Sequence, residues 1–163
     1  MEQVDKDWKV RRANSSEIPL LVGLWADEWN VTRVEEIPLQ EALWEELRRS
    51  GDVLVATNSQ EEIGGFAVTG RRPVRGTRGA SSGQAYVGEV DYLVSLYRRQ
   101  GIGRLLEASA LCHLAVHHER AVLDVEVSRD EEALQFWRAL DWQEINFSSE
   151  SSRVRTLVKD LKL

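Results

Sequence analysis

The stretch Tyr97-Arg98-Arg99-Gln100-Gly101-Ile102-Gly103-Arg104-Leu105-Leu106 decides the fold of this chain. The apolar run before it ends at Leu96 and a helical pattern begins inside it, which predicts a strand, a turn and a helix N-terminus. Glycines let a backbone approach an anion closely, and first-turn N–H groups and the helix dipole favour negative charge. The guanidinium groups of three arginines suit phosphate geometry. We therefore expect this glycine turn, residues 98–104, to bind a pyrophosphate group.

Two other phosphate-binding motifs do not fit the sequence. A Walker A loop requires Gly-x-x-x-x-Gly-Lys-Ser/Thr, a pattern that the chain lacks. A Rossmann fingerprint requires three spaced glycines near the start of a strand–helix–strand unit, whereas this turn has Gly101 and Gly103 alone. The alternative is a turn that merely connects a strand to a helix and binds no ligand.

Length and composition favour a single globular domain, which we expect to span residues 1–163. Hydrophobic residues make up 42% of the chain and charged residues 29%, and no apolar run approaches the roughly 18–20 residues of a membrane span. The first seven residues lack the regions of a signal peptide, and a single cysteine, Cys112, fits a reducing compartment. We expect a cytoplasmic protein that has no membrane partner.

Charge is distributed unevenly along the chain. The net charge of −6 disfavours a general nucleic-acid binder. The segment from Arg71 to Gly83 carries four arginines and no acid, whereas the region from Glu17 to Arg49 holds eight acids against three arginines. An acidic surface attracts cationic small molecules or basic peptides, although solubility alone also explains it.

Hydrophobic periodicity predicts eleven elements in the order β-α-α-β-β-β-α-β-α-β-β. We expect strands at residues 8–13, 52–57, 63–68, 85–96, 121–127, 142–147 and 153–158, and helices at residues 14–29, 38–50, 103–119 and 130–140. The helix between Leu96 and Ala121 predicts that its two flanking strands are parallel neighbours. The fold class is therefore α/β, a mixed sheet with helices on both faces.

Two expectations concern apolar residues of the predicted helices. Leu39, Leu43 and Leu47 share one face of the helix that Pro38 is expected to open. Cys112 lies within the longest predicted helix, where we expect it to be a small core residue.

The glycine turn resembles the acetyl-CoA-binding motif of the GCN5-related N-acetyltransferase (GNAT) superfamily. Arg98, Gly101 and Gly103 match the Arg/Gln-x-x-Gly-x-Gly/Ala pattern. A downstream segment, Asp130-x-x-Ala133-x-x-Phe136-Trp137-x-x-x-Asp141-Trp142, is similar to the family's Asn-x-x-Ala-x-x-Phe/Leu-Tyr-x-x-x-Gly-Phe. The order of elements also matches, so the resemblance covers nearly the whole chain. It implies a mostly antiparallel sheet of about seven strands with a splayed central strand pair, and N-acetyl transfer from acetyl-CoA.

The same resemblance implies which residues bind acetyl-CoA. The backbone N–H groups of residues 99–104 would surround the pyrophosphate, and Leu93 and Val94 match the strand positions that offer backbone groups to the pantetheine arm. The residues that the resemblance assigns to the cofactor are Leu93, Val94, Arg98, Arg99, Gln100, Gly101, Ile102, Gly103, Arg104, Asp130 and Trp137.

Acetyl transfer to an amine requires a neutral nitrogen, whereas a free lysine-type amine has a pKa near ~10.4. Glu89 lies four residues before Leu93, in a setting that resembles that of the glutamate general base in histone-acetylating members. Asp91 is expected on the same strand face, roughly 6.5–7 Å along the strand. One carboxylate would be the base while the other holds the substrate ammonium, and the alternative is that both merely line a solvated face. A backbone N–H near Leu93 would hold the oxyanion.

Trp137 departs from the family pattern at the position of its usual general acid, a tyrosine. An indole N–H cannot transfer a proton, so the thiolate would leave unassisted or another group would protonate it. A thiol pKa near ~8.5 makes unassisted departure feasible. His113 and His117 have i, i+4 spacing but no matching acid or cysteine, so we expect no metal.

The early helices contain candidate acceptor-binding residues. In the family these helices usually form one wall of the acceptor site, and Trp25 and Trp29 would there face a cationic amine beside Glu89 and Asp91. The alternative, which i, i+4 spacing favours, is that both tryptophans are core residues.

Three functions remain open from sequence. The first is an N-acetyltransferase acting on a small cationic molecule or a peptide amine, with a homodimer as a further expectation. The second is a non-catalytic acyl-CoA-binding module of the same fold, suggested by Trp137. The third is a nucleic-acid-associated protein that uses the segment from Arg71, which the net charge disfavours.

Overall fold

The computed structural model describes residues 7–74, 85–126, 131–145 and 153–161. Asp130 and most of the arginine-rich segment lie outside these ranges. The elements are β1 (Lys9–Arg12), a 3-10 turn η1 (Ser15–Glu17), α1 (Ile18–Glu28), α2 (Glu36–Arg49), β2 (Val53–Thr57), β3 (Ile63–Pro73), β4 (Tyr86–Ser95), α3 (Ile102–Ala115), β5 (Arg120–Glu126), α4 (Glu131–Ala139), β6 (Gln143–Glu144) and β7 (Val154–Asp160). Their order is the predicted one.

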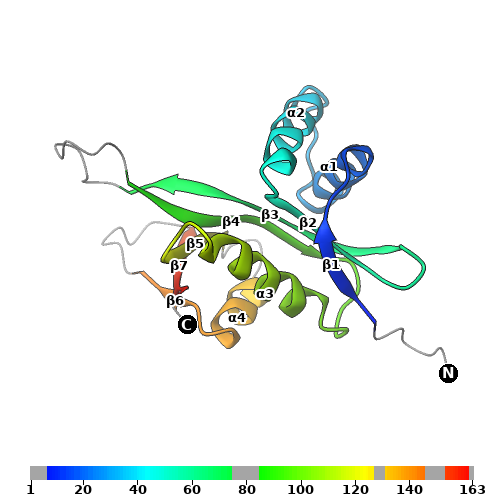
Figure 1. The fold of residues 1–163 in the computed structure, drawn as a ribbon. Helices are drawn as coiled ribbons and strands as arrows, with labels where there is room; N and C mark the ends of the chain where they lie inside the picture. The colour runs from blue at the N-terminus through cyan, green and yellow to red at the C-terminus, as the bar shows by residue number, and fades with distance from the viewer. Residues whose placement is uncertain (1–6, 75–84, 127–130, 146–152, 162–163) are drawn as a thin grey trace. The chain divides into compact units, whose positions relative to one another are not determined.

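The strands form one seven-stranded sheet in the order β1-β2-β3-β4-β5-β7-β6 (Figure 1). Strand pairs β1–β2, β2–β3, β5–β7 and β6–β7 are antiparallel, and β4–β5 is parallel, as expected from the intervening helix. The parallel register consists of Gly88↔Ala121 and Glu89↔Val122, although β4 continues to Ser95. The predicted mixed, mostly antiparallel sheet is therefore confirmed.

The chain divides into two compact units, each with its own packing. The first consists of Met1–Thr69 and Tyr92–His113, and the second of Gly70–Asp91 and Leu114–Leu163. The boundary crosses β3, β4 and α3. Our expectation of one domain over residues 1–163 stays a prediction.

The first unit has helices on both faces of its strands because the side chains of β3 alternate. Phe66 and Val68 belong to the core cluster that contains Trp25 and Trp44 of α1 and α2. Ala67, on the opposite face, belongs to a cluster with Ile102 and Leu106 of α3. Figure 1 shows α1 and α2 side by side on one face of β2 and β3.

The start of α2 and the burial of Cys112 differ from the prediction. Helix α2 begins at Glu36, so Pro38 is its third residue, and its buried side chain is Trp44. Leu39 and Leu43 are 72% and 53% exposed, whereas Leu47 is partly buried against the core cluster that contains Trp44. Cys112 is exposed rather than in the core, because α3 buries the face that carries Ala110 and Leu114.

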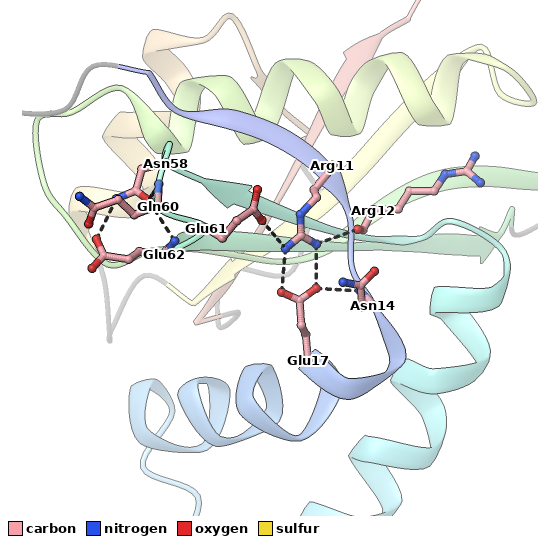
Figure 2. A network of polar contacts seen from close by, with 8 residues as sticks. All are labelled: Arg11, Arg12, Asn14, Glu17, Asn58, Gln60, Glu61 and Glu62. Carbon is pink, nitrogen blue, oxygen red and sulfur yellow. Dashed lines mark hydrogen bonds and ion pairs between the residues drawn. The ribbon is translucent and has the colours of Figure 1, made fainter.

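A charged network fixes the entry to α1 (Figure 2). The Arg11 guanidinium donates to both carboxylate oxygens of Glu17, at 2.7 and 2.9 Å, and also to Glu61 at 3.3 Å. The backbone N–H of Asn14 donates to Glu17 at 2.8 Å, which caps the helical segment. The hydrogen bonds from Arg11 lower the pKa of Glu17 in spite of its partial burial. This network joins β1, η1 and the turn that follows β2.

The second unit is held by strand pairing and aromatic packing. Seven residue pairs join β5 to β7, and Leu157 at their centre is fully buried. In α4, Trp137 packs between Phe136 and Trp142, with ring centroids 5.0 and 5.4 Å away. No helix within the described ranges is both long and apolar enough to cross a membrane.

Candidate functional site

The glycine turn enters α3 through two residues in the left-handed region. Arg99 has φ of 63° and Gly101 has φ of 76°. Helix α3 begins at Ile102, one residue before the predicted start, and the N–H of Leu105 donates to the carbonyl of Gly101 at 3.0 Å. The preceding N–H groups, from Ile102 to Arg104, therefore lie at the helix end where no intrahelical acceptor is available. The arginine side chains of the turn are exposed, as required for contact with an anion.

Contacts with Trp8, just before β1, and with β3 hold this turn in place. The N–H of Leu96 donates to the carbonyl of Gly64 at 2.8 Å. The indole of Trp8 donates to Gln100 Oε1 at 3.0 Å and stacks on Tyr97, with 5.8 Å between ring centroids. The turn is therefore supported by the first unit before any ligand binds.

Two adjacent glycines of β3 allow this close packing, and sequence analysis did not assign them a role. A Cβ on Gly65 would lie 2.4 Å from the carbonyl oxygen of Val94, and one on Gly64 would lie 2.5 Å from the Trp8 ring. Their signal is a Gly-Gly pair inside a strand, which indicates a close approach of another segment. Because these glycines have no side chain, β4 and the first turns of α3 can pack directly against the backbone of β3.

Glu89 and Asp91 lie on the same face of β4. The Glu89 side chain is 19% exposed and contacts Arg72 of β3. The Asp91 carboxylate lies beside Gly70, two residues earlier on β3, 3.0 Å from where a Cβ would stand. The structure therefore brings the two acids to one face, as alternation predicts, but with an arginine against Glu89.

Arg72 connects Glu89 to a second acid, Asp124 of β5. Its Nε and Nη2 both donate to Glu89 Oε1, the first at 3.1 Å. Its Nη1 and Nη2 donate to the two oxygens of Asp124, at 3.3 and 2.7 Å. Thr156 of β7 donates to Asp124 Oδ1 at 2.7 Å. We call Arg72, Glu89, Asp124 and Thr156 the carboxylate cluster.

Sequence analysis did not predict Arg72, Asp124 or Thr156 in this cluster. Arg72 lies in an arginine-rich segment, so nothing in the sequence distinguishes it from its neighbours. Asp124 comes near it only through strand pairing. Partial burial alone would lower the pKa of Arg72, but its hydrogen bonds to Glu89 and Asp124 outweigh this and raise it. Arg72 therefore stays protonated near neutral pH.

Comparison with known proteins gives a result at the level of structure. No family model and no curated protein matches the sequence. PH1933 of Pyrococcus horikoshii is similar, with a TM-score of 0.70 and 16% identity, covering 96% of this chain and 100% of that one. A candidate acetyltransferase of the GNAT family from Desulfovibrio desulfuricans has a TM-score of 0.69 and 16% identity, covering 95% and 99%. YncA, a candidate acetyltransferase from Salmonella typhimurium solved with acetyl-CoA, has a TM-score of 0.70 and 16% identity, covering 95% and 94%.

The chain has the GNAT fold. The Salmonella structure contains acetyl-CoA, so this fold accommodates an acyl-CoA. The residues present fit such a ligand, because the first N–H groups of α3 have no acceptor within the helix and the side chains of Arg98, Arg99 and Arg104 in the glycine turn are exposed. Next to this helix end, Val94 is buried and Leu93 is half-buried.

The other residues that the GNAT resemblance singled out have varied environments. Trp137, at the usual tyrosine position, is 7% exposed and enclosed by aromatic rings, and Asp130 lies outside the described residues. Trp25 is 8% exposed and is part of the core, and Trp29 packs on Tyr92 at 5.3 Å between centroids. The buried Nε1 of Trp25 has no hydrogen-bond partner among the described residues.

His113, in α3, and His117, just after it, do not form a metal centre with their described neighbours. His113 Nε2 lies 2.7 Å from Asp52 Oδ1, which also accepts a hydrogen bond from Thr69. Within the described ranges, no group of three or more candidate ligands lies close enough to hold a metal ion. The contact between His113 and Asp52 instead joins α3 to the start of β2.

Proposed function

We propose that this protein is an N-acetyltransferase that transfers an acetyl group from acetyl-CoA to a primary amine, carried by a small cationic molecule or a peptide. The observation that carries the proposal is the glycine turn between β4 and α3 of a GNAT fold, in which two left-handed residues lead directly into a helix N-terminus. The thioester of acetyl-CoA supplies the activated acetyl group.

In this proposal the glycine turn binds the pyrophosphate of acetyl-CoA. The N–H groups of residues 99–104 donate to the phosphate oxygens, and the guanidinium groups of Arg98, Arg99 and Arg104 neutralise their charge. Backbone groups of Leu93 and Val94 at the end of β4 pair with the pantetheine arm, which would satisfy polar groups of that strand.

Glu89 is the proposed general base. The amine nitrogen attacks the thioester carbonyl carbon, the new C–N bond replaces the C–S bond, and the nitrogen loses a proton to Glu89. Coenzyme A leaves as the thiolate and takes up a proton from water, because the indole of Trp137 cannot supply one. A positioned base of this kind contributes roughly 10²- to 10⁴-fold to the rate.

Two observations favour a second candidate, an acyl-CoA-binding module without catalysis. The Oε1 atom of Glu89 already accepts two hydrogen bonds from Arg72, and a buried tryptophan stands at the usual tyrosine position. A module of this kind would keep the glycine turn and use these residues for structure alone.

Calorimetry with acetyl-CoA and a thiol-release screen over primary amines distinguish the two candidates. We expect acetyl-CoA to bind and at least one amine to accelerate thiol release, with the acetylated product confirmed by mass spectrometry. Glu89→Gln should lower kcat at least a hundredfold and leave the Kd for acetyl-CoA within twofold.

Glu46→Gln is the matched control for Glu89→Gln, because Glu46 is an exposed acid of α2 and the substitution removes the same charge. Binding without turnover on any amine would favour the second candidate. Full activity of Glu89→Gln across the pH range would remove Glu89 as the base.

A further inference from the structure

We propose that Arg72 and Asp124 position Glu89 for catalysis, so that its Oε2 atom is the one that receives the substrate proton. This inference rests on the proposed function, because it assigns the orientation of the proposed base. Neither residue contacts acetyl-CoA or the amine in this scheme. Both act through Glu89.

The geometry around Glu89 is one-sided. Nε and Nη2 of Arg72 both donate to Oε1, so this atom is occupied by two charge-assisted hydrogen bonds. A carboxylate whose one oxygen is held in this way has lost rotation about its last torsion, and Oε2 takes a fixed direction. General-base catalysis requires the accepting atom of the base to be held in a fixed position relative to the substrate. A fixed Oε2 in a half-buried site meets this requirement.

Arg72 itself is held by the rest of the cluster. Strands β3 and β5 lie on either side of β4, roughly 9.6 Å apart at about 4.8 Å per strand, so the side chain must reach across a strand. Its Nη1 and Nη2 form a fork on Asp124, and Asp124 is the register partner of Thr156, which donates to it. The chain of contacts from β7 to β4 therefore ends on Glu89 Oε1.

An arginine is the residue type that this position requires. The planar guanidinium binds one carboxylate with two nitrogens and presents the edge formed by Nε and Nη2 to a second carboxylate. A lysine has the charge but lacks the fork and the Nε edge. Lysine at position 72 would therefore attract both acids without fixing the direction of Oε2.

The cluster charge is consistent with this role. Arg72 neutralises one of the two carboxylates of Glu89 and Asp124, so the group retains one negative charge. Asp91 is a further carboxylate on the same face of β4, and it is exposed. A single ammonium group can thus be attracted to this face while Arg72 stays in place.

The test uses Arg72→Met, Arg72→Lys and Asp124→Asn, assayed with acetyl-CoA and the amine that gives the fastest thiol release in the screen above. We expect kcat to fall about ten- to a hundredfold in Arg72→Met and several-fold in Asp124→Asn, with the KM for acetyl-CoA within twofold of the wild type. Arg72→Lys should recover less than a third of the loss in kcat. A kcat for Arg72→Met within twofold of the wild type would overturn the proposal.

Arg71→Met is the matched control. Arg71 is the neighbouring residue on β3, points to the opposite face and lies 4.1 Å above the ring of Tyr86, so the substitution removes the same side chain and charge without touching Glu89. We expect its kcat to stay within twofold of the wild type. An equal loss in Arg71→Met and Arg72→Met would mean that net charge or folding, rather than position, is responsible.

A double variant separates this inference from the proposed function. If Arg72 acts through Glu89, Arg72→Met in the Glu89→Gln background should cause no further loss in kcat. Additive losses would overturn the positioning role while leaving Glu89 as the base. Full activity of Glu89→Gln would instead overturn the proposed function itself.

A crystallographic readout needs no acceptor. In wild-type crystals Glu89 should occupy one rotamer with Oε1 on Arg72, whereas in Arg72→Lys it should occupy at least two. This second measurement decides the question if Arg72→Met fails to fold. A single unchanged rotamer of Glu89 in Arg72→Lys would contradict the proposal.

Discussion

The glycine turn before α3 and the carboxylate cluster on β3, β4, β5 and β7 are built in different ways. The turn depends on backbone shape, with left-handed residues at Arg99 and Gly101 and with Gly64 and Gly65 of β3 packed closely against the segment around it. The cluster depends on long charged side chains that meet across several strands. At Gly64 and Gly65 there is no room for even a methyl group, whereas in the carboxylate cluster each lost hydrogen bond weakens the contact only in part. The two regions should therefore respond differently to substitution.

Gly65→Ala tests the backbone-fit region and should have the largest effect. The new Cβ would lie 2.4 Å from the carbonyl oxygen of Val94, which belongs to a neighbouring strand and cannot rotate away. We expect the free energy of unfolding to fall by about 3 kcal/mol, measured by denaturant unfolding. Gly23→Ala in α1 is the control, because nothing lies within 4 Å of its Cβ and a helix favours alanine by about 0.5–1 kcal/mol. A loss below 1 kcal/mol for Gly65→Ala would show that β3 and β4 shift freely.

Arg11→Met tests a charged contact of the same kind as the carboxylate cluster, and its effect should depend on pH. Arg11 lowers the pKa of Glu17 below its ordinary 4.5, so the folded state binds that proton more weakly than the unfolded state. The stability that this pair contributes is therefore fully present above pH 4.5 and is lost as pH falls below it. Near pH 7 we expect Arg11→Met to cost about 2 kcal/mol, the value typical of charged hydrogen bonds in a partly buried site.

The control for Arg11→Met is Arg12→Met, since Arg12 points away from Glu17 in Figure 2 and packs over Gly51. Unfolding curves at pH 7 and at pH 3 give the comparison. The stability difference between wild type and Arg11→Met should shrink at pH 3, and that between wild type and Arg12→Met should not. An equal difference at both values would mean that the Arg11–Glu17 contact does not stabilise the fold.

The same difference explains why the glycine turn could be predicted from the sequence and the carboxylate cluster could not. The glycine turn is a local feature, in which Gly101, Gly103 and three arginines lie within seven residues, and a strand-to-helix change in period surrounds them. The face shared by Glu89 and Asp91 followed equally from local alternation. Arg72, Asp124 and Thr156 lie 17, 35 and 67 positions from Glu89 in the chain, so only strand order and register bring them together.

Helix packing shows a related limit. Periodicity places Leu39, Leu43 and Leu47 on one face of α2, but it does not determine how much of that face is buried: Trp44 is buried, whereas Leu39 and Leu43 are exposed. Cys112 was assigned to the core from residue type alone. Residue type predicts how often a cysteine is buried on average, but not which face of α3 this cysteine occupies.

Trp8→Phe removes one support of the glycine turn and should have a smaller effect than Gly65→Ala. Phenylalanine keeps a ring that can stack on Tyr97 but loses the indole donor to Gln100 Oε1. We expect a loss of about 1.5 kcal/mol in the free energy of unfolding, because the partly buried acceptor is left without its partner. Calorimetry should also show several-fold weaker binding of acetyl-CoA. Unchanged affinity would mean that this contact stabilises the fold without shaping the turn.

The smallest effect comes from a pair of substitutions at Arg99, which separates backbone from charge within the turn. Arg99→Ala and Arg99→Gly both remove the guanidinium group, but alanine keeps the strain of φ at 63° and glycine relieves it. We expect Arg99→Gly to be more stable than Arg99→Ala by about 1 kcal/mol in denaturant unfolding. Their affinities for acetyl-CoA should fall alike, because both have lost the same charge. A higher affinity in one variant would show that the turn's shape, and not its charge alone, determines how the anion is held.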